Sequence, residues 1–236
     1  MRKKFISIIA VLMLVSSLFT SSAFAKSEHA KKSLVALGDS ITFGYNLDEN
    51  NNHPSKVAFP SIIGKDTDMR VRNLGVPGWS TEQLLNALRK DDKFRQAVRH
   101  ADIITLNIGS NDFLQGLLAS IENPDVLPGI LENMVENIGS IISEIQSLSD
   151  AKIVVYNIFN PFPTESGVHA YVDYILPPVN SDIYSVIQSS NGDVILADAY
   201  SAIGDDQSIY IIKDDNHPTD LGHKILSEIA IKSLGL

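Results

Sequence analysis

The chain has 236 residues, of which 44% are hydrophobic, a formal net charge of −9 and no cysteine. Without cysteine it can form neither disulfides nor thiolate metal sites, so its stability must come from a hydrophobic core, which a chain of this length can bury in one domain. The net negative charge argues against nucleic acid and anionic lipid headgroups as binding partners.

The N-terminus has the pattern of a secretory signal peptide over residues 1–25. Basic residues at positions 2–4 precede an apolar run over 6–19, which is shorter than the roughly 20 residues that a membrane-spanning helix needs. Ala23 and Ala25 are the small side chains that a signal peptidase accepts, so we expect cleavage after Ala25 and export of a mature domain over 26–236. Cleavage would take the net charge from −9 to −12, because three basic residues and no acidic one are removed. An uncleaved membrane anchor is the alternative.

Hydrophobic periodicity then predicts an α/β protein. Short apolar runs predict buried strands at Leu34–Leu37, Val71–Leu74, Ile103–Ile108, Ile153–Ile158 and Val194–Leu196. Apolar residues three or four apart predict helices over Thr81–Leu88, Lys93–Val98, Val126–Leu148, Ile183–Ile187 and Asp220 to about Leu234. Alternating strands and helices indicate a parallel five-stranded sheet covered on both faces. Ser80 and Gln83 form a candidate capping box at the start of the first of these helices.

Three polar motifs directly follow the first three predicted strands. Gly38-Asp39-Ser40 follows the first strand, Gly75 to Gly78 the second and Gly109 to Asp112 the third. Ligands of open α/β sheets bind beyond the carboxyl ends of the strands, so these motifs are expected to converge there. The segments Asn46–Ser55 and Phe159–Pro178 are candidates to line or cover the crevice.

The residue types in these motifs suit acyl transfer. Ser40 at a strand-to-helix turn is a candidate nucleophile, although an N-cap serine is the plainer interpretation of this motif alone. His217 is a candidate base, with Asp214 or Asp215 beside it to orient the ring. An Asp-x-x-His pair can also hold a metal, but no second histidine stands at zinc-site spacing, and we expect no metal. The other histidines, His169 among them, are expected to lie on the surface or in packing.

Two further residues are candidate oxyanion donors. Gly78 allows close approach of its backbone N–H to a substrate, and Asn111 offers a neutral side-chain amide. Taken singly, each has another explanation, a turn glycine and an Asx-turn asparagine. Gly75 competes with Gly78 for the role. Together with the N–H of Ser40 they would supply three donors.

The order of these motifs resembles the four blocks of the SGNH hydrolases, also called the GDSL lipase/esterase family. The resemblance rests on Gly38-Asp39-Ser40, Gly78, Asn111 and Asp214-x-x-His217, and it extends from about Leu34 to the C-terminal helix. Ile41 stands where the GDSL name expects leucine, and it keeps an apolar residue behind the nucleophile.

This resemblance implies a three-layer α/β/α sandwich with a flavodoxin-like strand order. It implies that Ser40 is the nucleophile and His217 the base, and it favours Asp214 over Asp215 as the orienting carboxylate. It also favours Gly78, which precedes a polar helix start, so that Ser40, Gly78 and Asn111 would form the oxyanion hole.

The expected function is that of a secreted serine esterase or lipase, which cleaves carboxylic esters through an acyl-enzyme on Ser40. The substrate would be a small-molecule or lipid ester, and we expect no cofactor, no metal, no nucleic acid and no stable membrane insertion after signal cleavage. A carbohydrate O-acetyl esterase or an acyltransferase could use the same residues, and a non-catalytic binding module is the alternative from another class. The sequence leaves the acyl chain length, the alcohol portion and the oligomeric state open.

Overall fold

The computed structural model describes residues 30–236, and Lys31–Leu236 form one compact unit. The signal peptide expected over residues 1–25 lies outside the described residues. No helix within the described range is long and apolar enough to cross a membrane.

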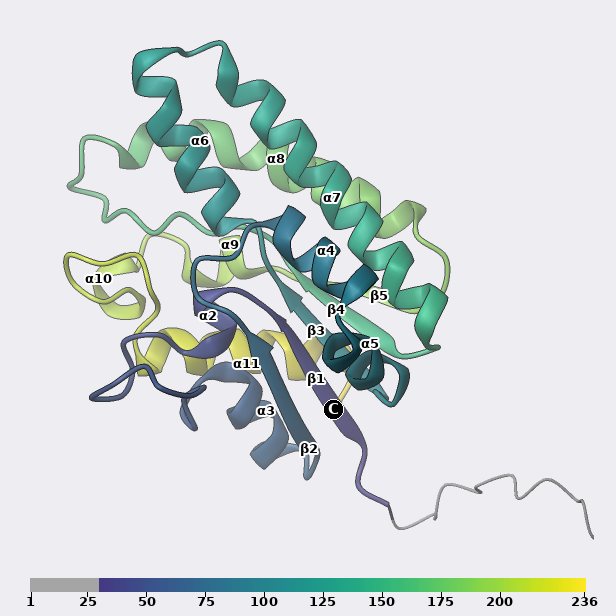
Figure 1. Ribbon diagram of the computed structural model, residues 1–236. Helices are drawn as coiled ribbons and strands as arrows, with labels where there is room; N and C mark the ends of the chain where they lie inside the picture. The colour runs from purple at the N-terminus through teal and green to yellow at the C-terminus, as the bar shows by residue number, and fades with distance from the viewer. Residues whose placement is uncertain (1–29) are drawn as a thin grey trace, which may run out of the picture. The chain divides into compact units, whose positions relative to one another are not determined.

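The core of the unit is a parallel sheet of five strands in the order β2-β1-β3-β4-β5 (Figure 1). The strands are β1 (Ser33–Gly38), β2 (Arg70–Gly75), β3 (Ile103–Asn107), β4 (Lys152–Tyr156) and β5 (Val194–Ala197). Their register places Leu37 of β1 between Leu74 of β2 and Leu106 of β3. This confirms the expected parallel sheet, and the strand order is the flavodoxin-like one.

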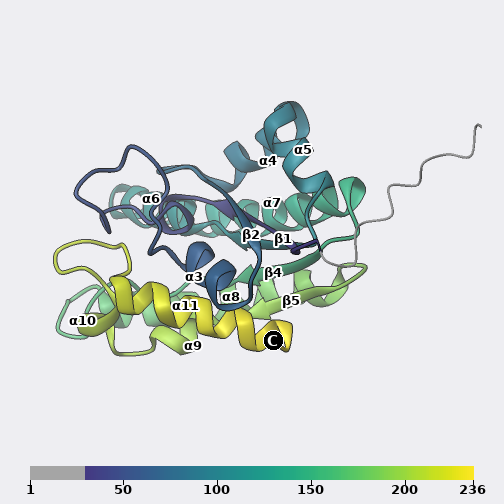
Figure 2. The same cartoon turned by 90° about the horizontal axis from the view of Figure 1, so that it is seen from below.

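Helices cover both faces of the sheet, because strand side chains alternate between two apolar clusters. Val35 and Leu37 of β1 pack into the larger cluster, whereas Leu34 packs into the smaller one on the opposite face. The larger cluster contains residues of α4 (Thr81–Lys90), α5 (Asp92–Arg99), α6 (Ser110–Glu122), α7 (Val126–Leu148) and α8 (His169–Ser189). The smaller contains residues of α3 (Phe59–Asp66), α9 (Ala199–Ile203) and α11 (Asp220–Leu234). Figure 2 shows α3 and α11 on one side of the strands and α4, α5 and α7 on the other.

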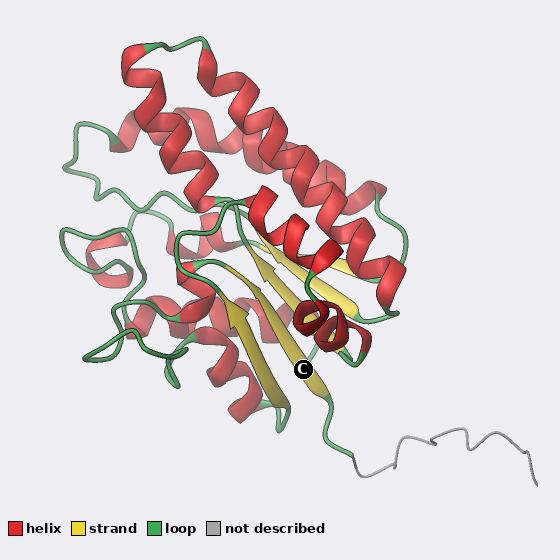
Figure 3. Ribbon diagram, in the orientation of Figure 1, coloured by secondary structure: helices red, strands yellow, loops and turns green. Residues whose placement is uncertain are grey.

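Two short helices complete the fold, α2 (Ser40–Phe43) after β1 and α10 (Gln207–Tyr210) before α11. The capping box of Ser80 and Gln83 is present at the start of α4, as the sequence predicts. Figure 3 shows the loops that carry the polar motifs gathered at the arrowhead ends of the strands.

The segment Phe159–Pro178, expected to line or cover the crevice, is helical in its second half. Helix α8 begins at His169 and continues through Pro177 and Pro178. Prolines normally interrupt a helix because they lack an N–H, but Leu176 and Val179 on either side are buried in the core. Tertiary packing therefore outweighs local propensity here, and the loop proper ends before α8.

Candidate active site

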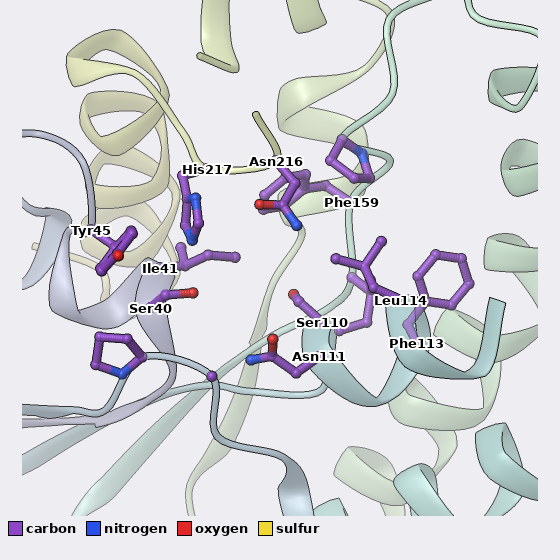
Figure 4. Close-up of a pocket in the computed structure, with 14 residues that line it drawn as sticks. Ser40, Ile41, Tyr45, Ser110, Asn111, Phe113, Leu114, Phe159, Asn216 and His217 are labelled. Carbon is purple, nitrogen blue, oxygen red and sulfur yellow. The ribbon is translucent and has the colours of Figure 1, made fainter. Parts of the chain in front are cut away.

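A cavity of about 350 Å³ opens beyond the carboxyl ends of the strands. Ser40, Gly78, Asn111 and His217 all line it, although they come from four distant parts of the sequence. Figure 4 shows the His217 ring and the Asn111 side chain turned toward the Ser40 hydroxyl. The structure therefore brings together four of the five residues predicted for the site. The wall also includes Tyr45, Ser110, Phe113, Leu114, Ile158, Phe159, Pro161 and Asn216.

Ser40 is the first residue of α2, at the point where β1 ends. Asp39 caps this helix, since its Oδ1 accepts a hydrogen bond from the Ile41 N–H at 2.9 Å. The turn needs Gly38, because a Cβ there would lie 2.1 Å from the Asn107 carbonyl oxygen. The N–H of the first helical residue has no partner inside the helix. That of Ser40 has none elsewhere in residues 30–236 either, and it is free to bind an oxyanion.

His217 lies near the end of a loop that folds back on itself before α11. Its carbonyl accepts from the Ile212 N–H at 2.9 Å, and Ile211 and Pro218 form an antiparallel bridge. The ring centroid of Tyr45 lies 5.2 Å from that of His217. No hydrogen bond joins the Ser40 hydroxyl to His217 in the described part of the chain, and in many hydrolases this bond tightens only when substrate binds.

The carboxylate that contacts His217 belongs to Asp215. Its Oδ1 lies 2.6 Å from His217 Nδ1, and it also accepts from the Asn216 N–H at 2.6 Å. This corrects the expectation that Asp214 orients the histidine. Asp214 has a φ of +59° in a turn closed by the Asp215 N–H on the Ile212 carbonyl, at 3.0 Å. Because that left-handed residue reverses the chain, Asp214 is exposed while the next residue meets the ring.

Asn46 holds the second oxygen of the same carboxylate. Its Nδ2 donates to Asp215 Oδ2 at 2.7 Å, across 169 positions of sequence. Asn46 is itself fixed by Asn51, which accepts from its backbone N–H at 2.9 Å and donates to its Oδ1 at 3.0 Å. Burial raises the pKa of Asp215, but hydrogen bonds from Asn46 and His217 outweigh it and leave this pKa below its ordinary value. The sequence pattern identified Asn46–Ser55 as a candidate crevice segment, but nothing in the sequence predicted the hydrogen bond from Asn46 to Asp215.

The two remaining candidate oxyanion donors, Gly78 and Asn111, are held by a turn and by a hydrogen bond to its last residue. Gly78 has a φ of +82°, follows Pro77, and lies in a turn closed by the Trp79 N–H on the Val76 carbonyl at 3.2 Å. A Cβ at Gly78 would meet nothing within 4 Å. Asn111 Nδ2 donates to the Trp79 carbonyl at 2.9 Å, which uses one amide hydrogen and leaves the other for a ligand.

Asp112 and Thr81 fasten the Gly78 and Asn111 segments together, a role that sequence reasoning missed. Asp112 Oδ2 accepts from the Thr81 N–H at 2.9 Å, and its Oδ1 accepts from the Thr81 hydroxyl at 2.7 Å. Asn137 of α7 donates to the same hydroxyl at 3.1 Å. The separation of the Gly78 and Asn111 segments is therefore set by contacts beside the cavity.

Two buried ionisable groups behind the site have displaced pKa values. Burial raises the pKa of Asp39 to about 7, and the nearby charge of Asp112 adds to the shift. Burial, and then the proximity of His217, lower the pKa of His223 to about 3. Both groups therefore resist charging in the folded state. A protonated Asp39 keeps negative charge away from the place where an oxyanion would form.

Comparisons with known proteins identify the family of this chain. Residues 36–225 match the model of the GDSL-like lipase/acylhydrolase family. The uncharacterized protein YpmR of Bacillus subtilis (strain 168) is 27% identical over 246 residues, which cover 98% of this chain and 95% of that protein.

Solved structures show the same fold at low identity. The lipase Lip_vut3 from a goat rumen metagenome has a TM-score of 0.73 at 21% identity, over 86% of this chain and 97% of that one. A catalytic mutant of Axe2, an acetylxylan esterase from Geobacillus stearothermophilus, has a TM-score of 0.64 at 16% identity, over 87% and 94%.

The family match spans most of the chain and includes the motifs that meet in the cavity. The cavity itself combines a serine at a helix start, a histidine oriented by a carboxylate, and donors for an oxyanion, which are the parts that ester hydrolysis requires. The chain belongs to the GDSL-like lipase/acylhydrolase family and is a serine hydrolase that acts on ester bonds.

Proposed function

We propose that this protein hydrolyses short-chain carboxylic esters through an acyl-enzyme on Ser40. The observation that carries the proposal is the bond between Asp215 Oδ1 and His217 Nδ1, at 2.6 Å. Because a carboxylate only accepts, this bond places a hydrogen on Nδ1 and leaves Nε2 as the free base. Figure 4 shows the ring above the Ser40 hydroxyl, where such a base is needed.

The reaction follows from these positions. His217 Nε2 takes the Ser40 proton as Oγ attacks the ester carbonyl, and the resulting oxyanion receives hydrogen bonds from Ser40 N–H, Gly78 N–H and Asn111 Nδ2. The ester C–O bond then breaks, and the alcohol leaves with the proton from the imidazolium. Water, deprotonated by the same histidine, attacks the acyl-enzyme and releases the carboxylic acid, which restores Ser40. Asp215 stabilises the imidazolium in both halves.

The walls of the cavity favour a small acyl group. Beyond the polar residues, the cavity is lined by Phe113, Leu114, Ile158 and Phe159, and its volume of about 350 Å³ is near the lower end of ligand pockets. We therefore expect acetate and butyrate esters to be cleaved faster than palmitate esters.

A second candidate substrate class is O-acetylated carbohydrate. A neighbouring cavity of about 770 Å³ shares Pro161 and Asn216 with the first. Its wall combines apolar residues such as Phe162 and Ile211 with the polar side chains of Glu165, Gln207 and Lys213. Hydrogen-bonding groups of this kind suit an alcohol portion with many hydroxyls, while the acetyl group would enter the smaller cavity. The acetylxylan esterase named among the structural neighbours acts on such a substrate.

Three measurements test the proposal. A fluorophosphonate probe should label the wild-type protein at Ser40, as mapped by peptide mass spectrometry, and it should leave Ser40→Ala unlabelled. A folded wild-type protein that is not labelled would indicate a non-catalytic binding module. Activity on p-nitrophenyl esters from acetate to palmitate, compared with acetylated xylo-oligosaccharides, then separates the two substrate classes. Addition of an acceptor alcohol, with detection of the new ester, distinguishes an acyltransferase.

We also propose that the protein is exported, on the basis of its basic and apolar N-terminus and of Ala23 and Ala25. The full chain should be expressed in a bacterial host and recovered from the medium. Mass spectrometry is expected to find Lys26 as the N-terminal residue. A protein that keeps Met1 and remains in the membrane fraction would support the uncleaved anchor instead.

A further inference from the structure

A second cluster of ionisable side chains lies outside the active-site cavity. It consists of His169 and Asp173 in the first turns of α8 and of Asp205 in the connection between α9 and α10. His169 Nε2 lies 3.0 Å from Asp173 Oδ2 and 3.7 Å from Asp205 Oδ1, and the three ligand atoms all lie within 4.8 Å of one another. We call these three residues the His169 cluster.

A backbone carbonyl selects the tautomer of the His169 ring. Its Nδ1 lies 2.7 Å from the Phe162 carbonyl oxygen, which can only accept, so Nδ1 carries a hydrogen. Asn160 Nδ2 lies near the same nitrogen, but it donates its two hydrogens to the His169 carbonyl at 3.2 Å and to Asp173 Oδ1 at 2.8 Å. A neutral imidazole would therefore point the lone pair of Nε2 at two carboxylate oxygens. That arrangement is repulsive unless Nε2 carries a proton or a metal ion occupies the space between them.

Neighbouring residues orient the side chains of the His169 cluster by hydrogen bonds, but they do not neutralise the charge of its two carboxylates. Asp173 Oδ1 accepts from Asn160 and, at 3.4 Å, from the Tyr200 hydroxyl, which leaves Oδ2 for the cluster. Hydrogen bonds of this kind, to the second nitrogen of a histidine and the second oxygen of a carboxylate, typically hold metal ligands in place. Within the described part of the chain, neither aspartate pairs with a lysine or arginine.

We propose that His169, Asp173 and Asp205 bind a divalent transition-metal ion, with zinc as the best match. One imidazole nitrogen and two carboxylate oxygens are ligands that zinc accepts, and water would complete the coordination. Ligands about 2.1 Å from zinc at tetrahedral angles lie roughly 3.4 Å apart, and the two distances from Nε2, 3.0 and 3.7 Å, lie on either side of that value. His169 is 8% exposed, so one ligand is already held in a buried position.

Such an ion would connect two segments that border the active site. The Phe162 carbonyl and Asn160 link the His169 cluster to the loop after β4, whose Pro161 lines both cavities. Asp205 adjoins α10, whose Gln207 lines the larger cavity and donates to the Asn160 carbonyl at 3.3 Å. The site is structural, since none of its three ligands lines the cavity that holds Ser40.

Metal binding can be measured without any assay of activity, so its outcome is independent of the proposed esterase function. Untagged protein is stripped with EDTA and dialysed, then titrated with zinc, manganese and calcium by isothermal calorimetry. We expect one zinc per chain, weaker binding of manganese and still weaker binding of calcium. At 100 times its Kd, zinc should raise Tm by roughly 5–10 °C. The proposal is overturned if zinc at millimolar concentration neither binds nor changes Tm.

Asp205→Asn is the decisive variant, because this side chain is 81% exposed and its replacement should leave the fold intact. We expect it to weaken zinc binding by about tenfold or more, whereas the neighbouring exposed Asp206→Asn should bind zinc like the wild type. Equal affinity in wild type and Asp205→Asn would show that zinc binds elsewhere. If zinc has no effect but Asp205→Asn lowers the Tm of the stripped protein more at pH 6 than at pH 8, a protonated His169 holds the carboxylates and the metal proposal is wrong.

Discussion

His217 Nδ1 lies 2.6 Å from Asp215 Oδ1, so the carboxylate that orients the histidine is two residues before it in the chain. The spacing differs from the three-residue spacing expected from the resemblance, because Asp214 occupies the left-handed position of the intervening turn. The two adjacent aspartates can therefore be compared directly, as a natural pair of test and control.

Asp215→Asn should lower kcat for p-nitrophenyl acetate by roughly 10²- to 10⁴-fold, because an amide no longer stabilises the imidazolium and can hold the ring in the wrong tautomer. Asp214→Asn, one residue away and exposed, should stay within about threefold of the wild type. Steady-state kinetics with both variants provides the test. A large loss in Asp214→Asn with little loss in Asp215→Asn would restore the assignment made from the resemblance.

Asn46→Gly should lower kcat by roughly tenfold with little change in KM, because it removes one hydrogen bond to a charged carboxylate. Glycine is the suitable replacement, since Asn46 has a φ of +64° that alanine would strain. Loss of this donor should also raise the pKa of Asp215 from its lowered value. Asn52→Gly, at an exposed position of the same loop, is the control. If both variants lose activity equally, loop flexibility rather than the Asp215 contact is responsible.

Ser40→Ala and His217→Ala should each reduce ester turnover by roughly 10³-fold or more, because the nucleophile and its base act as a unit. For the same reason the double variant should be little worse than either single one. Circular dichroism and Tm provide the check that the fold is kept. Activity within tenfold of the wild type in either single variant would contradict the assignment of that residue.

Asn111→Ala should lower kcat by roughly 10²- to 10³-fold and change KM little, because an oxyanion donor acts on charge that develops in the transition state. Should KM rise while kcat stays constant, Asn111 would bind the ground-state substrate instead.

His223 should make the stability of the protein sensitive to acid. Its folded-state pKa of about 3 is below the ordinary value of 6.5, so the unfolded chain binds a proton that the folded chain does not. The stability from this group is complete above pH 6.5 and is lost as the pH falls toward 3. Asp39 has a folded pKa of about 7, raised from 3.8, and therefore contributes the opposite slope between these two values.

The substitution His223→Asn separates the opposing contributions of His223 and Asp39 to the pH dependence of stability. In His223→Asn the side-chain oxygen can still accept from the Phe59 N–H, which donates to His223 Nδ1 at 3.2 Å in the wild type. The smaller side chain should lower Tm at pH 7 through a cavity. It should also remove the destabilisation that His223 contributes on acidification, so between pH 6.5 and 4.5 the free energy of unfolding should change more favourably in the variant than in the wild type, as measured by urea unfolding. An unchanged pH slope in this variant would mean that His223 does not remain neutral in the folded state.

Local patterns in the sequence were sufficient to predict much of the fold and the core of the site. Runs such as Leu34–Leu37 and Ile103–Ile108 identify buried strands because a parallel sheet hides both faces. Ser40, Gly78 and Asn111 could be assigned to one crevice because each follows a strand, and the carboxyl ends of parallel strands share one edge. The periodicity of Val126–Leu148 predicted α7 at the same bounds. These are consequences of chain geometry over a few residues.

The tertiary structure decided which carboxylate meets His217 and what holds it. The choice between Asp214 and Asp215 depends on the sign of one φ angle, and aspartate tolerates both signs. The bond from Asn46 to Asp215 joins residues 169 positions apart, so no local pattern contains it. The same is true of the contact between His169 and Asp205, which exists only because α8 and the connection after α9 pack side by side. Periodicity records which faces are buried, whereas hydrogen bonds between loops depend on where the packed elements leave their ends.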